Sequence, residues 1–549
     1  MIISLTIIPY LSSRLLKNHV TNPEGNIFMR GLKRLIHGSY ARLLDGALQR
    51  PWLTLAAAVL IFAGSIAVFR IIGFSLFPSS EKPQFMINIT APSQSNLAYT
   101  DSITHDLETQ LKGEHLVKFY SANIGKGNPR VYYNEVQENE RSDFAQIFVE
   151  LGEETSPEAK LEFMQQLRRR WTPYPGAQVE VRNFEQGPPV VAPVEVRLFG
   201  DNLDTLRALA ARVEPLLKHT AGTYYVTNPV SLLKSDIRVD VNKEKAQLLG
   251  VPTVAVDRAV RMAVTGLTIG KFYTDSKDNY DVLLTRDKPG RPDMDVFRDL
   301  YVNNASGTAI PLAQLADLKL ETSPAVIRHQ EKRRVVSLEA YVEKGFLVDR
   351  VLDDVIGKMN AFHFPPGYSY EMGGEVESRN NSFGGFGSII IVTVFLFIAV
   401  LILEFRTFKS TLIVLSVIPL GVVGAALALW LTGNSLSFVA IIGLIALAGI
   451  EVKNTILLVD FTNQLRAQGK SLEEAIREAG EIRFLPIVLT SLTAIGGLMP
   501  IALSTNPLIA PLAIVLIGGL VSSTLLSRIV TPVVYKLMPP KSQRADEQR

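Results

Sequence analysis

Cysteine is absent from this 549-residue chain, and other residue types that carry chemistry are scarce or scattered. Without cysteine, neither a disulfide scaffold nor a thiolate metal site can be proposed. The seven histidines lack the spacing of metal ligands, and the ten methionines do not cluster in the soluble region as a soft-metal relay would require. The sequence contains no recognisable arrangement of serine, histidine and aspartate that would indicate a hydrolase. The sequence therefore predicts no metal site, no cofactor and no enzyme.

A strong net charge is also missing, since the formal charge is only +3. This balance is too small to indicate nucleic acid as a partner. Gly469, Lys470 and Ser471 resemble the end of a phosphate-binding loop, but Gln464 stands where the first glycine of that motif belongs. Because no nucleotide site is predicted, an ion gradient is the energy source that we expect.

Long apolar runs are the main feature that the sequence does contain. They occupy residues 52–69, 389–403, 412–431, 438–459, 484–503 and 511–534, each near the length of a bilayer-spanning helix. Lysine and arginine gather before the first run, between the second and third, between the fourth and fifth, and after the sixth. Those segments should be cytoplasmic, which places residues 70–386 on the opposite side of the membrane.

The soluble region repeats one order of elements. Strand, helix and strand patterns follow one another twice in residues 83–184, and the same order returns in residues 192–228 and 333–374. This split βαβ pattern predicts two ferredoxin-like subdomains, the second interrupted by an insert at about 235–319.

Charged residues interrupt the apolar stretch at 438–461. Glu451 and Lys453 lie well inside it, where a charge costs roughly 2.5 to 3.5 kcal/mol. At 3.6 residues per turn, Gly449, Lys453 and Asp460 share one face, whereas Glu451 points elsewhere. This pattern predicts that Lys453 faces a polar channel for ions or protons; the alternative is that its amine snorkels to the interface.

Several motifs together resemble those of the resistance-nodulation-division (RND) efflux pumps, in the hydrophobe/amphiphile (AcrB-like) branch. They are IPLGVVGAALAL, GLIALAGIEVKNTILLVDF, EAGEIRFLPIVLTSLTAIGGLMPIAL, QGPPVVAPVEVRLFG and IPLAQLADL. The resemblance covers nearly the whole chain and identifies it as the C-terminal half of such a permease. It implies an α+β membrane protein: a helix bundle with six full spans and the tail of another, and a large periplasmic part of ferredoxin-like subdomains with a docking insert.

The order of the segments then assigns each part of the chain. The expected parts are the tail of a truncated span (1–11), a cytoplasmic or interfacial linker (12–51), the first full span (52–76), a porter subdomain (80–186), a second porter subdomain (187–232 and 321–374), the docking insert (233–320), a five-helix bundle (387–538) and a cytoplasmic tail (539–549). Within the linker, residues 29–48 read either as an interfacial amphipathic helix or as a solvated segment.

The resemblance also implies roles for residues in the spans. Lys453 falls on the lysine of the family's proton relay, Asn454 is its usual neighbour, and Arg483 and Thr490 fall on the relay residues of the next helix. Glu451 and Asp460 are possible extra acids. A lysine at position 453, where heavy-metal members tend to carry an acid, favours organic compounds as substrates. The paired aspartates of the family belong to the half that is missing here, so Lys453 has no evident partner.

A substrate pocket is implied in the soluble part. Phe148 falls on a phenylalanine of the family's pocket, and Tyr132, Tyr133, Lys126 and Arg130 lie in or near its loop. This loop has fewer phenylalanines than is typical of drug exporters, which favours a more polar or anionic amphiphile. The alternative is that these residues only pack the subdomain core.

The resemblance implies a multi-pass protein of the Gram-negative inner membrane, driven by the proton motive force. Its implied partners are the missing N-terminal half, two further copies in a homotrimer, a periplasmic adaptor, an outer-membrane channel, the lipid bilayer and amphiphilic small molecules. Two alternatives stay open: an RND-related protein that assists protein or lipid export, and an inactive truncated fragment.

Overall fold

The structure is a computed structural model that describes residues 6–15, 40–231, 233–275, 279–285 and 295–540. Two compact units are present, the first formed by Met1–Thr227 with Ser337–Arg549 and the second by Asn228–Val336. The predicted insert at 233–320 falls inside the second unit. Of the predicted linker helix at 29–48, residues 29–39 lie outside the described part of the chain. The short helices before the first span are α2 (Ile7–Leu15) and α4 (Ala41–Gln49).

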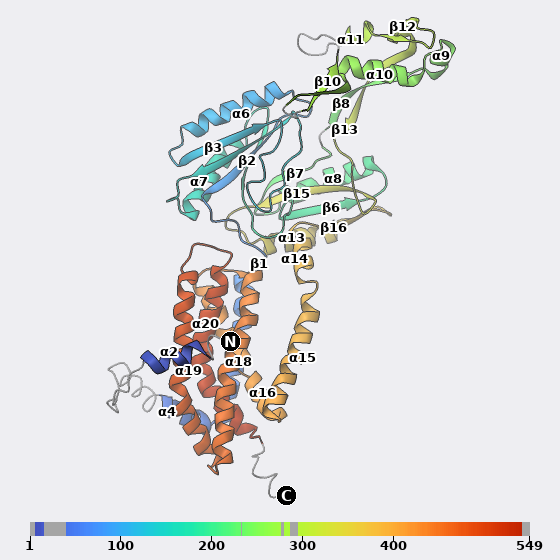
Figure 1. Ribbon diagram of the computed structural model, residues 1–549. Coiled ribbons are helices and arrows are strands. Elements are labelled where there is room, and N and C mark those ends of the chain that lie inside the picture. Colours follow the sequence, from blue (N-terminus) through green and yellow to red (C-terminus); the bar gives the residue numbers. More distant parts are fainter. Residues whose placement is uncertain (1–5, 16–39, 232, 276–278, 286–294, 541–549) are drawn as a thin grey trace. The chain divides into compact units, whose positions relative to one another are not determined.

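Six helices in the described residues are long and apolar enough to cross a membrane, as predicted (Figure 1). They are Pro51–Ile72, Glu375–Phe405, Phe408–Leu431, Phe438–Ala467, Leu472–Ala502 and Ala510–Leu537. Their elements are α5 (Pro51–Ile72), α14 (Glu375–Phe383), α15 (Phe386–Phe405), α16 (Phe408–Leu415), α17 (Ile418–Leu431), α18 (Phe438–Ala467), α19 (Leu472–Ala502) and α20 (Ala510–Leu537).

The first of these spans differs from the prediction, and the third is interrupted by a proline. The first ends at Ile72 rather than 76, because Gly73 takes a φ of 70°, where glycine carries no steric penalty. The chain then forms β1 (Phe74–Ser75), which pairs with β17 (Leu436–Ser437) just before α18. The third span is broken between α16 and α17 because Pro419, in the first turn of α17, has no N–H for a continuous helix.

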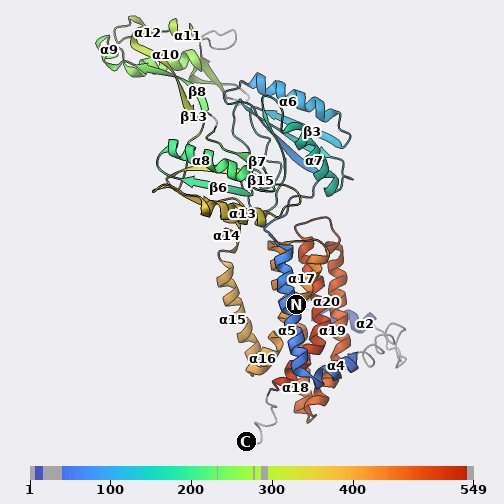
Figure 2. The same ribbon diagram turned by 180° about the vertical axis from the view of Figure 1, so that it is seen from behind.

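Small residues let α17 and α20 pack backbone to backbone. A Cβ added to Gly424 would collide with the Gly518 carbonyl oxygen, and one added to Gly518 would collide with Gly424 and Ala428. Gly519 similarly receives the side chain of Leu447 from α18. Helix α5 packs against both α17 and α20 (Figure 2). Small residues therefore allow these helices to pack closely at these positions.

The first porter subdomain is ferredoxin-like, as predicted. Its elements are β2 (Gln84–Thr90), α6 (Leu97–Lys112), β3 (Val117–Ile124), β4 (Phe144–Leu151), α7 (Pro157–Trp171) and β5 (Gln178–Asn183). The antiparallel sheet has the order β3-β4-β2-β5. The side chains of Asn96 and Ser156 cap α6 and α7 by accepting backbone N–H bonds in the first turn. The helices and one sheet face enclose a core that includes Phe85, Ile147 and Trp171.

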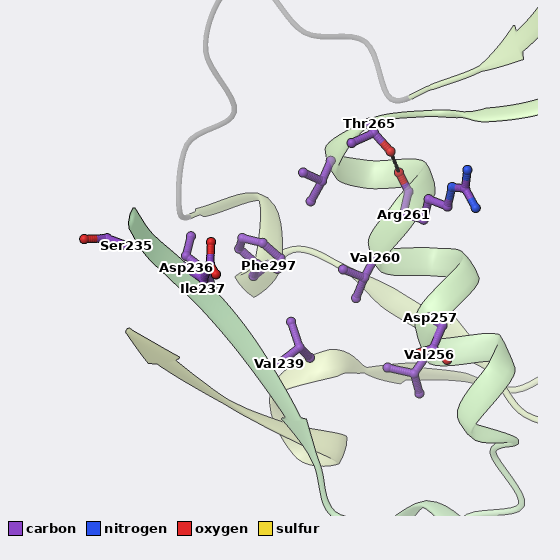
Figure 3. A pocket seen from close by; sticks show the side chains of 11 residues that line it. Ser235, Asp236, Ile237, Val239, Val256, Asp257, Val260, Arg261, Thr265 and Phe297 are labelled. Carbon is purple, nitrogen blue, oxygen red and sulfur yellow. Dashed lines mark hydrogen bonds between the residues drawn. The ribbon is translucent and has the colours of Figure 1, made fainter. Parts of the chain in front are cut away.

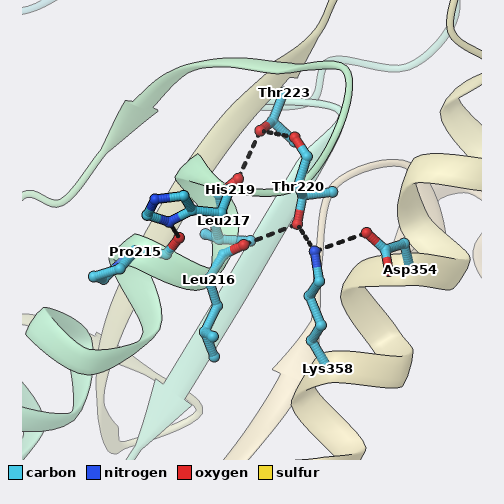
Figure 4. Close-up of polar contacts among 8 residues, drawn as sticks. All are labelled: Pro215, Leu216, Leu217, His219, Thr220, Thr223, Asp354 and Lys358. Carbon is cyan, nitrogen blue, oxygen red and sulfur yellow. Dashed lines mark hydrogen bonds and ion pairs between the residues drawn. The ribbon is translucent and has the colours of Figure 1, made fainter.

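The second porter subdomain repeats this arrangement. Its elements are β6 (Val194–Phe199), α8 (Leu203–Lys218), β7 (Thr223–Thr227), β14 (Arg328–Gln330), β15 (Arg333–Val342), α13 (Val348–Ala361) and β16 (Ser369–Met372). The sheet order is β14-β15-β6-β16, with β7 also paired to β15. A polar contact joins α13 to the turn that follows α8: Lys358 of α13 donates to the Thr220 hydroxyl at 2.7 Å, and within α13 it donates to Asp354 at 2.8 Å (Figure 4).

Cation–π contacts join the two porter subdomains. The Arg168 guanidinium lies 4.6 Å from the ring centre of Tyr224, and that of Arg182 lies 4.9 Å from the ring centre of Tyr341. Arg168 also donates to the Val181 carbonyl oxygen at 2.9 Å. Such contacts are worth about 0.5 to 2 kcal/mol each, depending on desolvation.

The second unit is a separate small domain. Its remaining elements are β8 (Leu233–Val241), α9 (Lys243–Leu248), α10 (Thr253–Val264), β9 (Leu267–Tyr273), β10 (Asn279–Leu284), α11 (Asp295–Arg298), β11 (Tyr301–Asn303), β12 (Ala309–Pro311), α12 (Leu312–Leu315) and β13 (Ala316–Pro324). Strands β8 and β13 form a long antiparallel ribbon, and α10 packs over an apolar core containing Val256 and Phe297. A cavity of about 510 Å³ opens between β8 and α10 (Figure 3).

A fully buried lysine joins elements of the first porter subdomain. The amine of Lys160 donates to the carbonyl oxygens of Ser80 and Lys82, at 2.5 and 2.8 Å, and to the side-chain oxygen of Asn183 at 3.0 Å. Burial lowers the pKa of Lys160 from 10.5 to about 8, and the acids Glu81 and Glu185 only partly oppose this shift. The protonated amine therefore costs about 3 kcal/mol of folding free energy at neutral pH.

We expect this lysine to give the subdomain a stability that rises with pH. Between pH 8 and 10.5 the unfolded state binds more protons than the folded state, so the free energy of unfolding increases over this interval and is flat below it. Relative to Lys160→Met, the wild type should gain up to about 3 kcal/mol across this range. Urea unfolding of the full chain in detergent, followed by the fluorescence of the buried Trp171, measures the difference.

The exposed Lys112 on α6 provides the control, because Lys112→Met should follow the wild type at every pH. A Lys160→Met variant whose unfolding free energy changes with pH in parallel to the wild type would contradict the assignment.

Candidate functional site

The two charged residues predicted to be separate on α18 do lie on different faces. Glu451 is 2% exposed and continues a buried stripe with Leu447, Thr455 and Leu458, spaced three or four residues apart. Lys453 and Gly449 are exposed, and Asp460 on the same face is half-buried. One side of α18 is therefore turned into the bundle of this chain, and the side carrying Lys453 is turned out of it.

Lys453 is thus not enclosed by the spans of this chain, and its predicted position facing a polar channel stays a prediction. Within the described residues its amine forms no hydrogen bond or ion pair, and Asn454, half-buried beside it, forms none either. Asp460 is about 10.5 Å away along the helix axis at 1.5 Å per residue. Its carboxylate accepts a bond from the Gln464 amide at 2.8 Å. The lysine stands in the middle of a span, available to a surface outside this chain.

The other two relay candidates lie on α19. The guanidinium of Arg483 lies 4.6 Å from the ring centre of Phe461 on α18, and its Nε is buried without a hydrogen-bond partner among the described residues. Thr490 is exposed and donates its hydroxyl to the Ile487 carbonyl oxygen at 2.8 Å.

The packing of α18 against α19 sets the depth of these residues. A connection of only four residues, 468–471, makes the two helices antiparallel neighbours. Starting from the contact between Phe461 and Arg483, two turns back along α18 lead to Asn454, and two turns on along α19 lead to Thr490. Lys453, Asn454 and Thr490 therefore lie at one level of the bundle, and Arg483 and Asp460 lie together at another.

A buried arginine on α20 was missed by the sequence analysis. Arg528 is 2% exposed, and its guanidinium lies 5.6 Å from the ring centre of Phe484. Its backbone oxygen accepts the Tyr40 hydroxyl at 3.3 Å, and the Tyr40 ring lies 4.9 Å from that of Phe484. The sequence did contain a signal for this buried charge, because an arginine interrupts the apolar run 511–534. The contacts that surround it, from residues 40 and 484, are far away in sequence.

An aromatic cluster forms on the open face of the first porter sheet. Phe148 projects from β4 on the face away from the helices, and its ring lies 6.2 Å from that of the buried Phe184. Tyr132 stacks on Phe184 at 4.7 Å and lies 5.0 Å from Tyr133. The structure thus brings three predicted pocket residues together around Phe184, which the sequence analysis missed because its position depends on the fold.

The basic residues of this loop are placed differently. Arg130 donates to the backbone oxygen of Tyr133, whereas Lys126 is exposed and has no polar contact within the described chain. Lys82 lies 5.8 Å from the ring centre of Tyr132 instead. The cluster therefore combines aromatic faces with nearby cations, but Lys126 is not part of it.

Hydrogen bonds fix the loop that carries Tyr132 and Tyr133. The Asn134 amide donates to the backbone oxygens of Glu185 and Gly187, at 2.9 and 3.1 Å. The Tyr133 hydroxyl accepts the Gly187 N–H at 2.5 Å. A cavity of about 380 Å³ follows this segment, lined by Pro188, Pro189, Glu195, Arg197 and neighbouring residues, and none of the five predicted pocket residues lines it.

The described residues contain no group of three or more histidine, cysteine, aspartate or glutamate side chains that could hold a metal ion. The titratable residues of the spans and the aromatic cluster are therefore the two candidate sites.

Comparisons with known proteins place this arrangement in a family. The sequence model of the AcrB/AcrD/AcrF family matches residues 1–539. The cation efflux system protein CzcA of Alcaligenes sp. and the cobalt-zinc-cadmium resistance protein CzcA of Cupriavidus metallidurans are each 24% identical over the whole chain. The crystal structure of a heavy metal efflux pump superimposes with a TM-score of 0.77 at 20% identity, covering 93% of this chain and 52% of that one.

The chain spans about half the length of the curated relatives that it matches, 52% in both cases. The fold predicted from the RND resemblance is confirmed by this likeness and by the two ferredoxin-like sheets. The chain belongs to the AcrB/AcrD/AcrF family of RND permeases.

Proposed function

We propose that this chain works as the C-terminal half of a proton-driven exporter permease, with Lys453 as its proton-carrying group. The observation that carries the proposal is the position of Lys453, exposed near the middle of a span with no ionic partner in the described chain. A charge facing lipid at this depth is costly, so a functional assembly must cover it with a polar partner. A second half that supplies acidic residues at this surface meets the requirement.

Family membership and the number of spans support the assignment of this chain to a multi-pass protein of the inner membrane. The shared level of Lys453, Asn454 and Thr490 supports a relay that extends onto α19, with Arg483 at the level of Asp460. Further partners belong to the same proposal: two more copies in a trimer, a periplasmic adaptor and an outer-membrane channel.

Proton-linked dye efflux in vesicles tests this function. The chain alone should give no efflux, because its lysine has no acidic partner, and adding an N-terminal half with the family's acid pair should restore it. Efflux from the chain alone would exclude the proposal that transport requires acidic residues from a second half. No efflux from the completed pair would favour an inactive fragment.

For the substrate we propose an amphiphilic organic compound, because Phe148, Tyr132 and Phe184 form an aromatic cluster beside Lys82 and Arg130. A metal cation is the second candidate. It is favoured by the names of the two relatives, which describe cation efflux and cobalt-zinc-cadmium resistance. The carboxylates, amides and thioethers near the aromatic cluster would have to supply its ligands.

Phe148→Ala separates the two candidates. In a completed pump, we expect resistance to amphiphilic anions to fall several-fold, because the substitution removes an aromatic surface worth about 0.5 to 1.5 kcal/mol per ring contact. Tolerance to zinc, cobalt and cadmium should not change. Growth inhibition assays with both kinds of compound measure this.

Phe119, on β3 of the same subdomain, is exposed and outside the cluster, so Phe119→Ala is the matched control. If Phe148→Ala left resistance to all tested compounds unchanged, the pocket assignment would be withdrawn in favour of simple packing. A change restricted to metal tolerance would favour the cation.

A further inference from the structure

The carboxyl group of Glu451 is enclosed by helices of this chain alone. Glu451 is the fourteenth residue of the 30-residue helix α18 and is only 2% exposed. Both of its carboxyl oxygens are buried, and neither has a hydrogen-bond partner among the described residues. Unlike Lys453, whose surface is open, this acid needs no second half to bury it.

Gly421 provides the space that the carboxyl group occupies. A Cβ added to Gly421 on α17 would overlap both carboxyl oxygens of Glu451, so the acid lies directly against the α17 backbone. On the α20 side, Ser523 lies close enough to interact with the carboxyl group. Its hydroxyl is directed to the Leu520 carbonyl oxygen at 3.3 Å. The neighbouring Ser522 donates to the Leu420 carbonyl oxygen at 2.8 Å.

No cation on the surrounding helices balances this acid. Helix α17 contains no titratable residue, and Lys409 of α16 is directed to the Pro539 carbonyl oxygen. On α20, Arg528 stacks on Phe484 and Lys536 pairs with Glu473. Arg483 of α19 lies over Phe461. The remaining charged groups of these elements lie at their ends or on other faces: Lys453, Asp460 and Arg466 on α18, and Glu473, Glu474, Arg477, Glu478 and Glu481 on α19.

Within the described residues, an ionised carboxylate in this position would have only the Ser523 hydroxyl as a nearby donor, and it would have no counter-ion. Burying such a charge is far more costly than burying the neutral acid, which then has the polarity of an ordinary hydrogen-bonding group. A metal ion is a poor counter-ion here, since Ca²⁺ takes six to eight oxygen ligands and Mg²⁺ requires an octahedron of them. The serine hydroxyls nearby are already directed to backbone oxygens. A proton requires only one carboxyl oxygen.

We propose that Glu451 is a proton-binding site in the transmembrane core, separate from the exposed face of Lys453. With α17, α18 and α20 packed as they are, the carboxyl group holds its proton at neutral pH. Release of the proton requires water or a cation to reach the carboxyl group beside Gly421. Only the use of this proton in export rests on the proposed function; the binding itself does not.

Infrared difference spectroscopy of the full chain in lipid bilayers tests the site directly. The difference between wild type and Glu451→Gln at neutral pH should show the C=O stretching band of a protonated carboxyl group, and the band should shift in D₂O. Glu404 is exposed on α15, so Glu404→Gln is the control and should leave this band in place. If Glu451→Gln removed carboxylate bands instead, the proposal would be overturned.

Two further measurements distinguish a bound proton from a misfolded variant and from a bound metal cation. Glu451→Leu serves the same comparison if Glu451→Gln does not fold, and loss of the band is expected in either variant. Raising the sodium concentration at constant pH should leave the band unchanged; replacement of the band by carboxylate bands would identify a metal-cation site and overturn the proton assignment. The outcomes are independent of Lys453, since Lys453→Met should retain the band whether or not efflux is lost.

Discussion

Lys453→Met should reduce proton-linked efflux by a completed pump to the background of vesicles without protein. The lysine lies in the middle of α18, exposed on a surface that the spans of this chain do not cover. A charged group at this depth is costly unless a polar or acidic partner covers it. Methionine preserves the length and apolar stem of the side chain, so the expected loss comes from the charge.

The measurement is dye efflux from vesicles that hold both halves of the pump, with and without an imposed pH gradient. Lys409→Met is the matched control, because Lys409 is exposed at the start of α16 and, within the described residues, its amine donates only to the Pro539 carbonyl oxygen, at 3.4 Å. It should keep wild-type efflux. Co-purification of the two halves shows that Lys453→Met still assembles. Full efflux with methionine at position 453 would exclude the relay.

Gly424→Ala should destabilise the bundle strongly although it adds only one methyl group. The new Cβ would meet the Gly518 carbonyl oxygen and Ser522, so α17 and α20 would have to separate. Over-packing in a close-packed core costs about 1 to 3 kcal/mol, and a clash with backbone lies at the upper end because no side chain can rotate away. We therefore expect a lower thermal midpoint and a smaller folded yield in detergent.

The opposite result is expected at Gly496 of α19, where no atom lies within 4 Å of an added Cβ. Gly496→Ala should be neutral or should stabilise the helix by up to about 1 kcal/mol, since alanine is the better helix former. Thermal unfolding of both variants of the chain, measured in parallel, checks the pair. Equal midpoints for the two variants would contradict close packing through Gly424.

The spans and the two porter subdomains were predictable because their signals are local. A run of about twenty apolar residues identifies a bilayer-spanning helix regardless of its neighbours. Strand and helix periods identify the βαβ order in the same way. The boundaries of interrupted elements were less certain: Gly73 ended the first span early, and Pro419 divided the third.

The candidate sites depended on contacts that sequence patterns do not encode. Phe184, which directly follows β5, joined the aromatic cluster through tertiary contacts with Tyr132 and Phe148, and Arg528 became buried by contacts from Phe484 and Tyr40. The pattern of α18 separated Glu451 from Lys453, but it could not tell which of them this chain would bury.

The sequence by itself determined the membrane class, the six spans, the duplicated ferredoxin-like fold and the different faces of Glu451 and Lys453, because each follows from the period or length of one segment. Only the tertiary structure decided that α17 and α20 enclose Glu451 beside Gly421 while Lys453 stays exposed. The physical reason is that burial depends on which small residues allow two helices to approach closely. That choice is made between segments far apart in the chain.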